Sequence, residues 1–214
     1  MLYHILGALS SALFLLTWYG LYKQLAAIDA KKQTNQVSTQ NLSINQFASS
    51  FFAFYANFIF GIAIDPFNHY LVWTRFGALL LLVVILFRVF QERRGVLSSV
   101  VFMSTLLAFI GGIISIAFRP FPDIAKLATD ALMLIVTVVL VQGTLHQYWL
   151  LHKSKSIGNL SFTLIQSILI KDISTLMFAL TMPFAIAWPL LVLNGSSVIA
   201  RGTLLLKMRL IQNA

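Results

Sequence analysis

Charged and amide side chains stand inside stretches of sequence that are otherwise apolar enough to cross a membrane. Lys171 and Asp172 lie about ten residues into the apolar block 161–182, which places them near the middle of a bilayer at a helical rise of about 1.5 Å per residue. Asn194 lies at a similar depth in the block 185–207. A charge at the centre of a span costs about 2.5–3.5 kcal/mol on insertion scales, so such side chains tend to face a cavity or a partner. We therefore take these residues as candidates for a substrate or coupling-ion pathway.

Further polar residues in the apolar blocks extend this candidate pathway. Asn57 lies somewhat past the centre of the block 44–64, and Thr175 is its counterpart in the internal repeat described below. Arg201 lies deeper toward the cytoplasm, and Arg75 stands in the outer third of its block. For the asparagines the alternative role is hydrogen bonding between helices, which commonly joins membrane helices. Arg75 alternatively extends outward along its stem to the membrane surface.

The charged residues also need partners. Successive helical residues point about 100° apart, so Lys171 and Asp172 are poor partners for each other. We expect one of them to face the pathway and the other to pair with a neighbouring helix, with Arg201 or Arg75 as the partner of Asp172. The alternative is a buried ion-pair network that only fixes helix packing.

Catalytic chemistry has no comparable pattern in this sequence. The histidines are scattered along the chain, at His4, His69, His146 and His152. No His-x-x-x-His pair, paired carboxylates, nucleophile motif or phosphate-binding glycine loop occurs. The absence of cysteine excludes thiol catalysis, disulfides and thiolate metal sites. We therefore expect no enzyme, with no catalytic residue, no cofactor and no metal site.

The elements that carry the polar residues are long apolar blocks. The sequence is 59% hydrophobic and only 10% charged, and a bilayer crossing needs about 20 helical residues. The composition predicts an all-α membrane protein with seven transmembrane helices. The blocks cover about residues 5–24, 44–64, 70–90, 96–118, 130–151, 161–182 and 185–207. The glycines of the pair Gly111-Gly112 are expected to be packing surfaces of the fourth helix.

The net charge of +9 follows the expected topology. When loops are assigned alternately to the two sides, one side receives most of the Lys and Arg residues, which indicates that it is cytoplasmic. These residues are Lys23, Lys31, Lys32, Arg88, Arg93, Arg94, Lys153, Lys155, Lys207 and Arg209. The N-terminus is then outside and the C-terminus cytoplasmic, and the charge does not indicate nucleic-acid binding. We expect an integral protein of the bacterial inner (cytoplasmic) membrane, whose first block is a retained span rather than a signal peptide.

An internal repeat divides the chain. Residues 20–24 and 143–147 share the pattern Gly-x-x-x-Gln at the cytoplasmic end of an apolar block. The polar loops that follow end in a shared Ser-x-x-Asn-Leu-Ser, at residues 38–43 and 156–161.

The repeat extends into the third span of each half and predicts the domain organisation. Gly77 and Gly195 are related by the same 118-residue offset as the Ser-x-x-Asn-Leu-Ser segments. The repeat predicts two parallel three-helix bundles, at residues 1–91 and 128–214, joined by a linking transmembrane helix at residues 92–127.

The repeated segments resemble a known family. The second copy has His146-Gln147 followed by Lys-Ser-Ile-Gly-Asn-Leu-Ser at residues 155–161, and the first has Lys23-Gln24. With the 3+1+3 layout, this pattern is similar to the PQ-loop (MtN3-like) transporter superfamily, related to SWEET, SemiSWEET and cystinosin-like proteins. Lys23 and His146 occupy the positions of the family's proline.

The resemblance implies roles for the motif residues. Gln24 and Gln147 would line the cytoplasmic mouth of the pathway. The hinge that proline provides in the family would come from Gly20 and Gly143, three residues before the substituted positions.

The resemblance also implies a transporter of a small polar solute, an amino acid or a sugar, by alternating access at a midplane site between the two repeats. The charged midplane residues favour an ionisable or zwitterionic solute, and proton coupling through Asp172 is left open. The alternative is a KDEL-receptor-like ligand-binding membrane receptor or scaffold without net transport. The expected partners are a small-molecule solute and the lipid bilayer, with no nucleic acid, and a homo-oligomer is left open.

Overall fold

The chain folds as a series of α-helices. The computed structural model describes residues 1–33, 44–154 and 162–212, and within these ranges it contains helices and no β-strand. A 3₁₀ turn, η1 (Ile116–Phe118), continues the fourth helix. The α-helices are α1 (Leu2–Gln33), α2 (Ile44–Ala63), α3 (His69–Arg93), α4 (Val96–Ser115), α5 (Asp123–Ser154), α6 (Phe162–Ala179) and α7 (Phe184–Gln212).

Several of these helices are long and apolar enough to cross a membrane, as the composition predicts. Five described helices meet this description, over Leu2–Ala30, His69–Arg93, Val96–Phe118, Asp123–Lys153 and Phe184–Gln212. A shorter apolar helix covers Phe47–Ala63. The chain is therefore an all-helical protein with the helices of an integral membrane protein. The number of seven crossings, the orientation and the repeat boundaries stay predictions.

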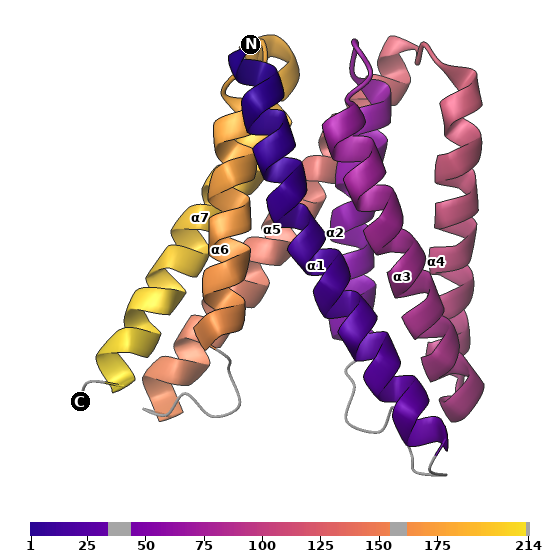
Figure 1. Ribbon diagram of the computed structural model, residues 1–214, viewed down its shortest axis with the longest axis vertical. Helices are drawn as coiled ribbons and strands as arrows, with labels where there is room; N and C mark the ends of the chain where they lie inside the picture. Colours follow the sequence, from indigo (N-terminus) through magenta and orange to yellow (C-terminus); the bar gives the residue numbers. More distant parts are fainter. Residues whose placement is uncertain (34–43, 155–161, 213–214) are drawn as a thin grey trace. The chain divides into compact units, whose positions relative to one another are not determined.

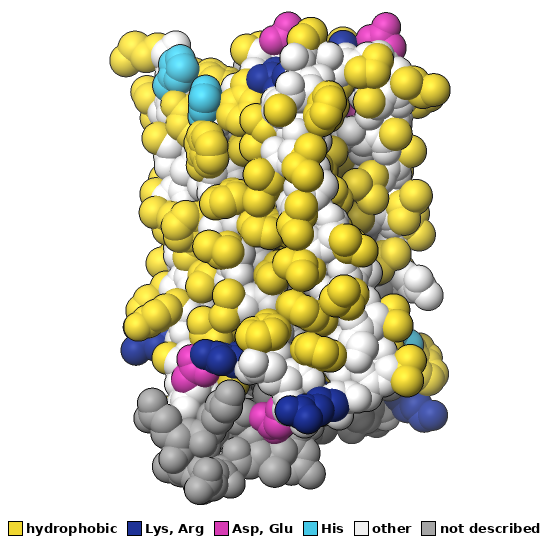
Figure 2. Space-filling view, turned by 90° about the vertical axis from the view of Figure 1, so that its right-hand side faces the viewer, with side chains coloured by type: hydrophobic (Ala, Val, Ile, Leu, Met, Phe, Trp, Pro, Cys, Tyr) yellow, Lys and Arg dark blue, Asp and Glu magenta, His cyan; other side chains and the backbone are white. Residues whose placement is uncertain are grey.

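The surface has the apolar character that lipid contact requires. On the face drawn in Figure 2, hydrophobic side chains cover the middle and charged side chains lie toward the two ends. Along α4, Val100, Met103, Leu107 and Ile114 follow one another at helical spacing and are each more than half exposed. Such a continuous apolar stripe is unfavourable in water and favourable against lipid chains.

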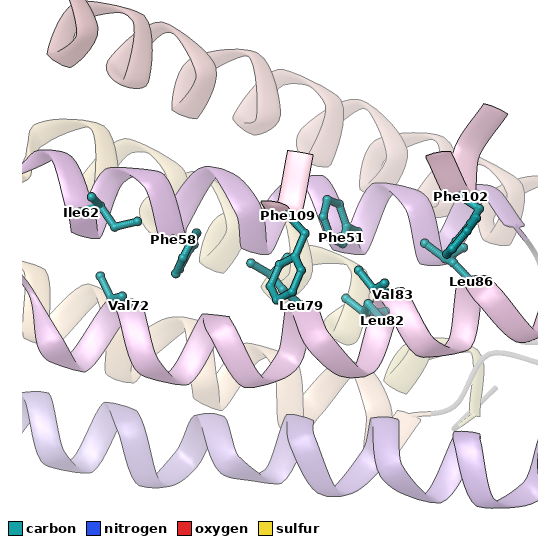
Figure 3. Packing of buried hydrophobic residues seen from close by; sticks show 10 residues of the cluster. All are labelled: Phe51, Phe58, Ile62, Val72, Leu79, Leu82, Val83, Leu86, Phe102 and Phe109. Carbon is teal, nitrogen blue, oxygen red and sulfur yellow. The ribbon is translucent and has the colours of Figure 1, made fainter. Parts of the chain in front are cut away.

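The chain divides into two compact units, of which one comprises Ser11–Thr129. In this unit α2, α3 and α4 pack against one another. Their facing sides form one buried apolar cluster, in which Phe58 and Leu79 have no exposed surface (Figure 3). α3 lies at the centre of this packing, because 61% of its most apolar stretch is buried.

Small residues let two helix pairs in this unit approach closely. At Gly112 in α4, an added Cβ would lie 2.9 Å from Cε2 of Tyr55 and 3.0 Å from Cε1 of Phe58, both in α2. At Gly77 in α3, an added Cβ would overlap the indole ring of Trp18 in α1. These contacts fix how α4 meets α2 and how α1 meets α3.

The connections of this unit are closed by specific hydrogen bonds. Asn68, which is fully buried, caps α3 by accepting a bond from the backbone N–H of Leu71 at 3.0 Å. Nη2 of Arg119, beyond η1, donates to the carbonyl oxygen of Ile64 at 2.9 Å. The guanidinium of Arg119 also lies 4.8 Å from the ring centroid of Phe67. One arginine thus joins the α4–α5 connection to the α2–α3 turn.

The other compact unit comprises Met1–Ser10 and Asp130–Ala214. Within it α6 packs along α7, and the two helices run side by side in Figure 1. The first residues of α1 pack on α6: Ser10 and Thr175 share a hydrogen bond of 3.1 Å between their hydroxyl oxygens, and the rings of Tyr3 and Phe178 lie 5.1 Å apart. This unit contains the charged residues that the sequence places near mid-span.

Candidate functional site

A cluster of charged and polar side chains lies between α6 and α7. Its centre is Asp172, whose residue surface is only 2% exposed. Nζ of Lys171 lies 3.0 Å from Oδ1 of this carboxylate. Ser197 Oγ donates a hydrogen bond of 2.6 Å to Oδ2, and Nη1 of Arg201 forms an ion pair with the same oxygen. We call Lys171, Asp172, Ser197 and Arg201 the Asp172 cluster.

Helical spacing explains how α7 supplies two partners to one carboxylate. Ser197 and Arg201 are four residues apart, so their side chains lie on the same face of the helix. Nη1 of Arg201 also donates to Ser197 Oγ at 2.8 Å, which fixes the two side chains relative to each other. Both then contact Asp172, which lies on the face of α6 that packs against α7.

The cluster satisfies a carboxylate that would otherwise be very unfavourable inside the helices. An ionised carboxylate away from water loses several kcal/mol of hydration, which only close opposite charges and hydrogen bonds offset. Asp172 has two cations and one hydroxyl at its oxygens. The cations are less enclosed than the carboxylate, since their side chains are 17% and 19% exposed against 4% for Asp172.

The structure differs from the sequence expectation for the neighbouring pair Lys171 and Asp172. Helical geometry separates their Cβ directions, yet the two side chains form an ion pair. The long flexible stem of lysine lets its Nζ reach the neighbouring carboxylate in spite of this angle, which a shorter side chain could not do. Of the two arginines considered as partners for Asp172, the structure pairs it with Arg201.

Arg75 lies in the other compact unit and has different surroundings. It is 3% exposed, so it does not extend outward to the membrane surface as the alternative for this residue proposed. Its guanidinium carbon lies 4.2 Å from the ring centroid of Phe14, and its Nη1 donates to Thr74 Oγ1 at 2.8 Å. A guanidinium over an aromatic face is a favourable arrangement away from water.

The amide and hydroxyl side chains that the sequence places near mid-span form hydrogen bonds mainly to backbone carbonyl oxygens of their own helices. Nδ2 of Asn57 donates to the carbonyl oxygen of Ala53 at 2.9 Å, and Nδ2 of Asn194 donates to that of Leu190 at 2.8 Å. Both asparagines are buried. Thr175 donates to the carbonyl oxygen of Lys171 at 3.0 Å in addition to its contact with Ser10.

The motif residues lie on continuous helices. α1 runs through Gly20 and Gln24, and α5 runs through Gly143 and Gln147, without interruption. Among the described residues, nothing lies within 4 Å of where a Cβ at Gly20 or Gly143 would stand. Both glutamines are half-buried. The repeated Ser-x-x-Asn-Leu-Ser segments, at residues 38–43 and 156–161, lie outside the described residues.

Ser197 is the member of the cluster that sequence reasoning missed. A serine in an apolar span is common and draws no attention by itself. The available signal was its position four residues before Arg201, which puts the hydroxyl on the charged face of the helix.

Metal ligands do not gather in the part of the chain that the structure describes. There, no group of three His, Cys, Asp or Glu side chains is placed to hold a metal ion. The polar groups that come together are instead the two cations, the carboxylate and the hydroxyl of the Asp172 cluster.

No protein-family model matches the sequence, and no curated protein matches it significantly.

Proposed function

We propose that this chain is a membrane transporter of a small polar solute that works by alternating access, and that it belongs to the PQ-loop superfamily that its repeated segments resemble. The observation that carries the proposal is the Asp172 cluster. Among the described residues, a buried carboxylate on α6 has two cations beside it, one of them on α7, which is long and apolar enough to cross a bilayer.

The partial exposure of the cations favours a binding role over a packing role. Complete enclosure of two cations with one carboxylate would carry a desolvation cost that their attraction need not offset, so access to water or to an anion lowers the free energy of such a cluster. In the Asp172 cluster the carboxylate is enclosed while the Lys171 and Arg201 side chains keep 17% and 19% of their surface exposed. Charged groups at this depth tend to mark substrate and ion pathways.

The helix pattern supports the repeat on which the family proposal rests. The 32-residue α1 is followed by α2 and α3 with 20 and 25 residues, and the 32-residue α5 by α6 and α7 with 18 and 29. Asn57 and its counterpart Thr175 are both buried within the second helix of their triplet. Parallel repeats of this kind are typical of one class of secondary transporters.

The test is solute uptake into proteoliposomes that contain the full chain. A panel of amino acids and sugars is offered with and without a pH gradient, and the proposal expects uptake of at least one solute. Proton coupling through Asp172 expects that Asp172→Asn abolishes stimulation by the pH gradient. Asp130→Asn is the matched control, because it changes an acid of the same compact unit that lies outside the cluster.

Two outcomes would contradict the proposal separately. Absence of flux for every solute would exclude transport and favour a ligand-binding receptor or scaffold. Undiminished gradient-driven flux in Asp172→Asn would exclude proton coupling through this carboxylate while leaving transport in place.

A further inference from the structure

The charges of the Asp172 cluster do not balance. Lys171 and Arg201 contribute two positive charges and Asp172 contributes one negative charge. The sequence offers no second acidic side chain nearby, because Asp172 is the sole Asp or Glu between residues 131 and 214. Asp130, the other acid of this compact unit, lies in the first turns of α5 rather than at mid-span. Within the described residues of this compact unit, the acidic side chains therefore leave the cluster with a net positive charge.

The hydrogen bonds of Arg201 leave one edge of its guanidinium unused. Both of its bonds, to Asp172 Oδ2 and to Ser197 Oγ, come from Nη1. Within the described part of the chain, Nε and Nη2 donate to no other group. The N–H groups of Nε and Nη2 are parallel, and their spacing matches the two oxygens of a carboxylate.

Away from water, the unused edge of Arg201 needs an acceptor. A guanidinium N–H that faces hydrocarbon without an acceptor costs free energy, because lipid chains cannot replace the hydrogen bonds of water. The Arg201 side chain is 19% exposed, so the protein itself does not fill the space beside it completely. An occupant with two acceptor oxygens and one negative charge would satisfy both the unused donors and the uncompensated charge.

We propose that the Nε–Nη2 edge of Arg201 binds the carboxylate of the solute. This inference rests on the proposed transport function and narrows its substrate class. The solute is an organic acid or an amino acid, and neutral sugars are excluded. Asp172 then has two roles: it holds Nη1 so that the opposite edge is presented in one orientation, and it keeps the site at a single net positive charge that one carboxylate neutralises.

Direct binding to the purified full chain tests the proposal first. The protein in a neutral maltoside detergent, without phosphate, is titrated with acetate, lactate, succinate and alanine, and unfolding is followed by tryptophan fluorescence. The matched uncharged probes are lactamide and glucose. We expect saturable stabilisation by at least one carboxylate and none by lactamide or glucose. Equal stabilisation by lactate and lactamide, or by none of the probes, would overturn the proposal.

Variants of α7 locate the binding site. Arg201→Gln is expected to weaken carboxylate binding about 10- to 100-fold, which is the usual effect of losing charge-assisted hydrogen bonds. Arg201→Lys keeps the charge but not the paired donors, and an intermediate affinity is expected. Lys207→Gln is the control, because it removes the same charge from the same helix outside the cluster. Equal losses in Arg201→Gln and Lys207→Gln would show a general charge effect and overturn the assignment.

Changes at Asp172 separate anion binding from loss of folding. Arg201→Gln leaves the buried carboxylate with fewer partners, so the double variant Asp172→Asn/Arg201→Gln provides a neutral pair at the same positions. We expect the double variant to fold and not to bind carboxylates. Asp172→Asn alone should bind them at least as tightly as the unchanged protein, since the site gains positive charge and the amide oxygen of asparagine can still accept a bond from Nη1 and hold its orientation. Loss of carboxylate binding in Asp172→Asn with retention in Arg201→Gln would contradict the proposal.

A lipid phosphate offers the same oxygen chemistry as a solute carboxylate, and the titration distinguishes them. Stabilisation by added phosphatidylglycerol that depends on Arg201, without stabilisation by any free carboxylate, would assign the edge to lipid and overturn the proposal. Uptake measurements separate this inference from the transport function. Uptake of glucose without carboxylate binding would overturn the inference and leave transport, whereas carboxylate binding without any uptake would support the inference and exclude transport.

Discussion

Trp18 occupies the space beside the backbone of Gly77, so that α1 and α3 meet at an aromatic ring on one side and a bare helix backbone on the other. The indole Nε1 also donates a hydrogen bond of 2.6 Å to the carbonyl oxygen of Thr74. The hydrogen bond thus fixes one end of the ring, and the missing side chain at Gly77 leaves room for the other end. Gly195, at the repeat-related position in α7, has no such neighbour within 4 Å among the described residues.

This asymmetry predicts different effects for the same substitution at two repeat-related positions. Gly77→Ala would force the Trp18 ring away, and overpacking of this kind costs about 1–3 kcal/mol. Gly195→Ala meets open space and should be neutral, or stabilising by up to about 1 kcal/mol from helix propensity. Thermal unfolding in detergent, followed by far-UV circular dichroism, measures both. A larger loss for Gly195→Ala than for Gly77→Ala would contradict the α1–α3 contact.

The hydroxyl of Ser197 is expected to contribute to stability through the charges that it contacts. Ser197→Ala removes the bond to Asp172 and an acceptor for Arg201, and we expect a loss of about 1–3 kcal/mol. Ser196→Ala is the matched control, because the adjacent hydroxyl makes no hydrogen bond among the described residues. It should change the stability by less than about 0.5 kcal/mol. Equal unfolding temperatures for the two variants would show that the Ser197 hydroxyl is not needed to satisfy Asp172.

The sequence predicts the helices well because a membrane-spanning length of apolar residues is a local property. The block 44–64 corresponds to α2, and the block 96–118 corresponds to α4 with η1. The helix ends are less predictable. α1 continues to Gln33, well beyond the last apolar residue of its block, because its polar continuation is rich in Ala, Lys and Gln, which favour helix without favouring lipid.

The contacts of the candidate site depend on tertiary packing, which a single sequence does not contain. Depth in the helix identified Asp172 and Arg201, but their pairing was one of two alternatives. Arg75 instead lies over Phe14, a contact between α1 and α3 that no local pattern indicates. Likewise Gly111 and Gly112 were both expected to be packing surfaces, and only Gly112 is buried against α2.

Arg119 is expected to hold the α4–α5 connection on the α2–α3 turn. Arg119→Ala removes the bond to the Ile64 carbonyl oxygen and the contact with the Phe67 ring, and we expect a loss of about 1–3 kcal/mol. Lys126→Ala is the control. Its ion pair with Asp123 is exposed, so its loss should cost less than about 1 kcal/mol. A comparable loss of stability in both variants would point to a general effect of positive charge rather than to the Arg119 contacts.

The two adjacent glycines of α4 test how this helix is attached. A Cβ at Gly112 would press on the rings of Tyr55 and Phe58 at 2.9 and 3.0 Å, so either the rings or the helix must shift. We expect Gly112→Ala to lower the stability by about 1–3 kcal/mol. Gly111→Ala points away, with nothing within 4 Å among the described residues, and should leave the stability unchanged or slightly raised. Because both substitutions add one methyl group to the same turn, the difference between their unfolding temperatures measures the α2–α4 contact alone, and a reversed order would place the packing face of α4 on the opposite side.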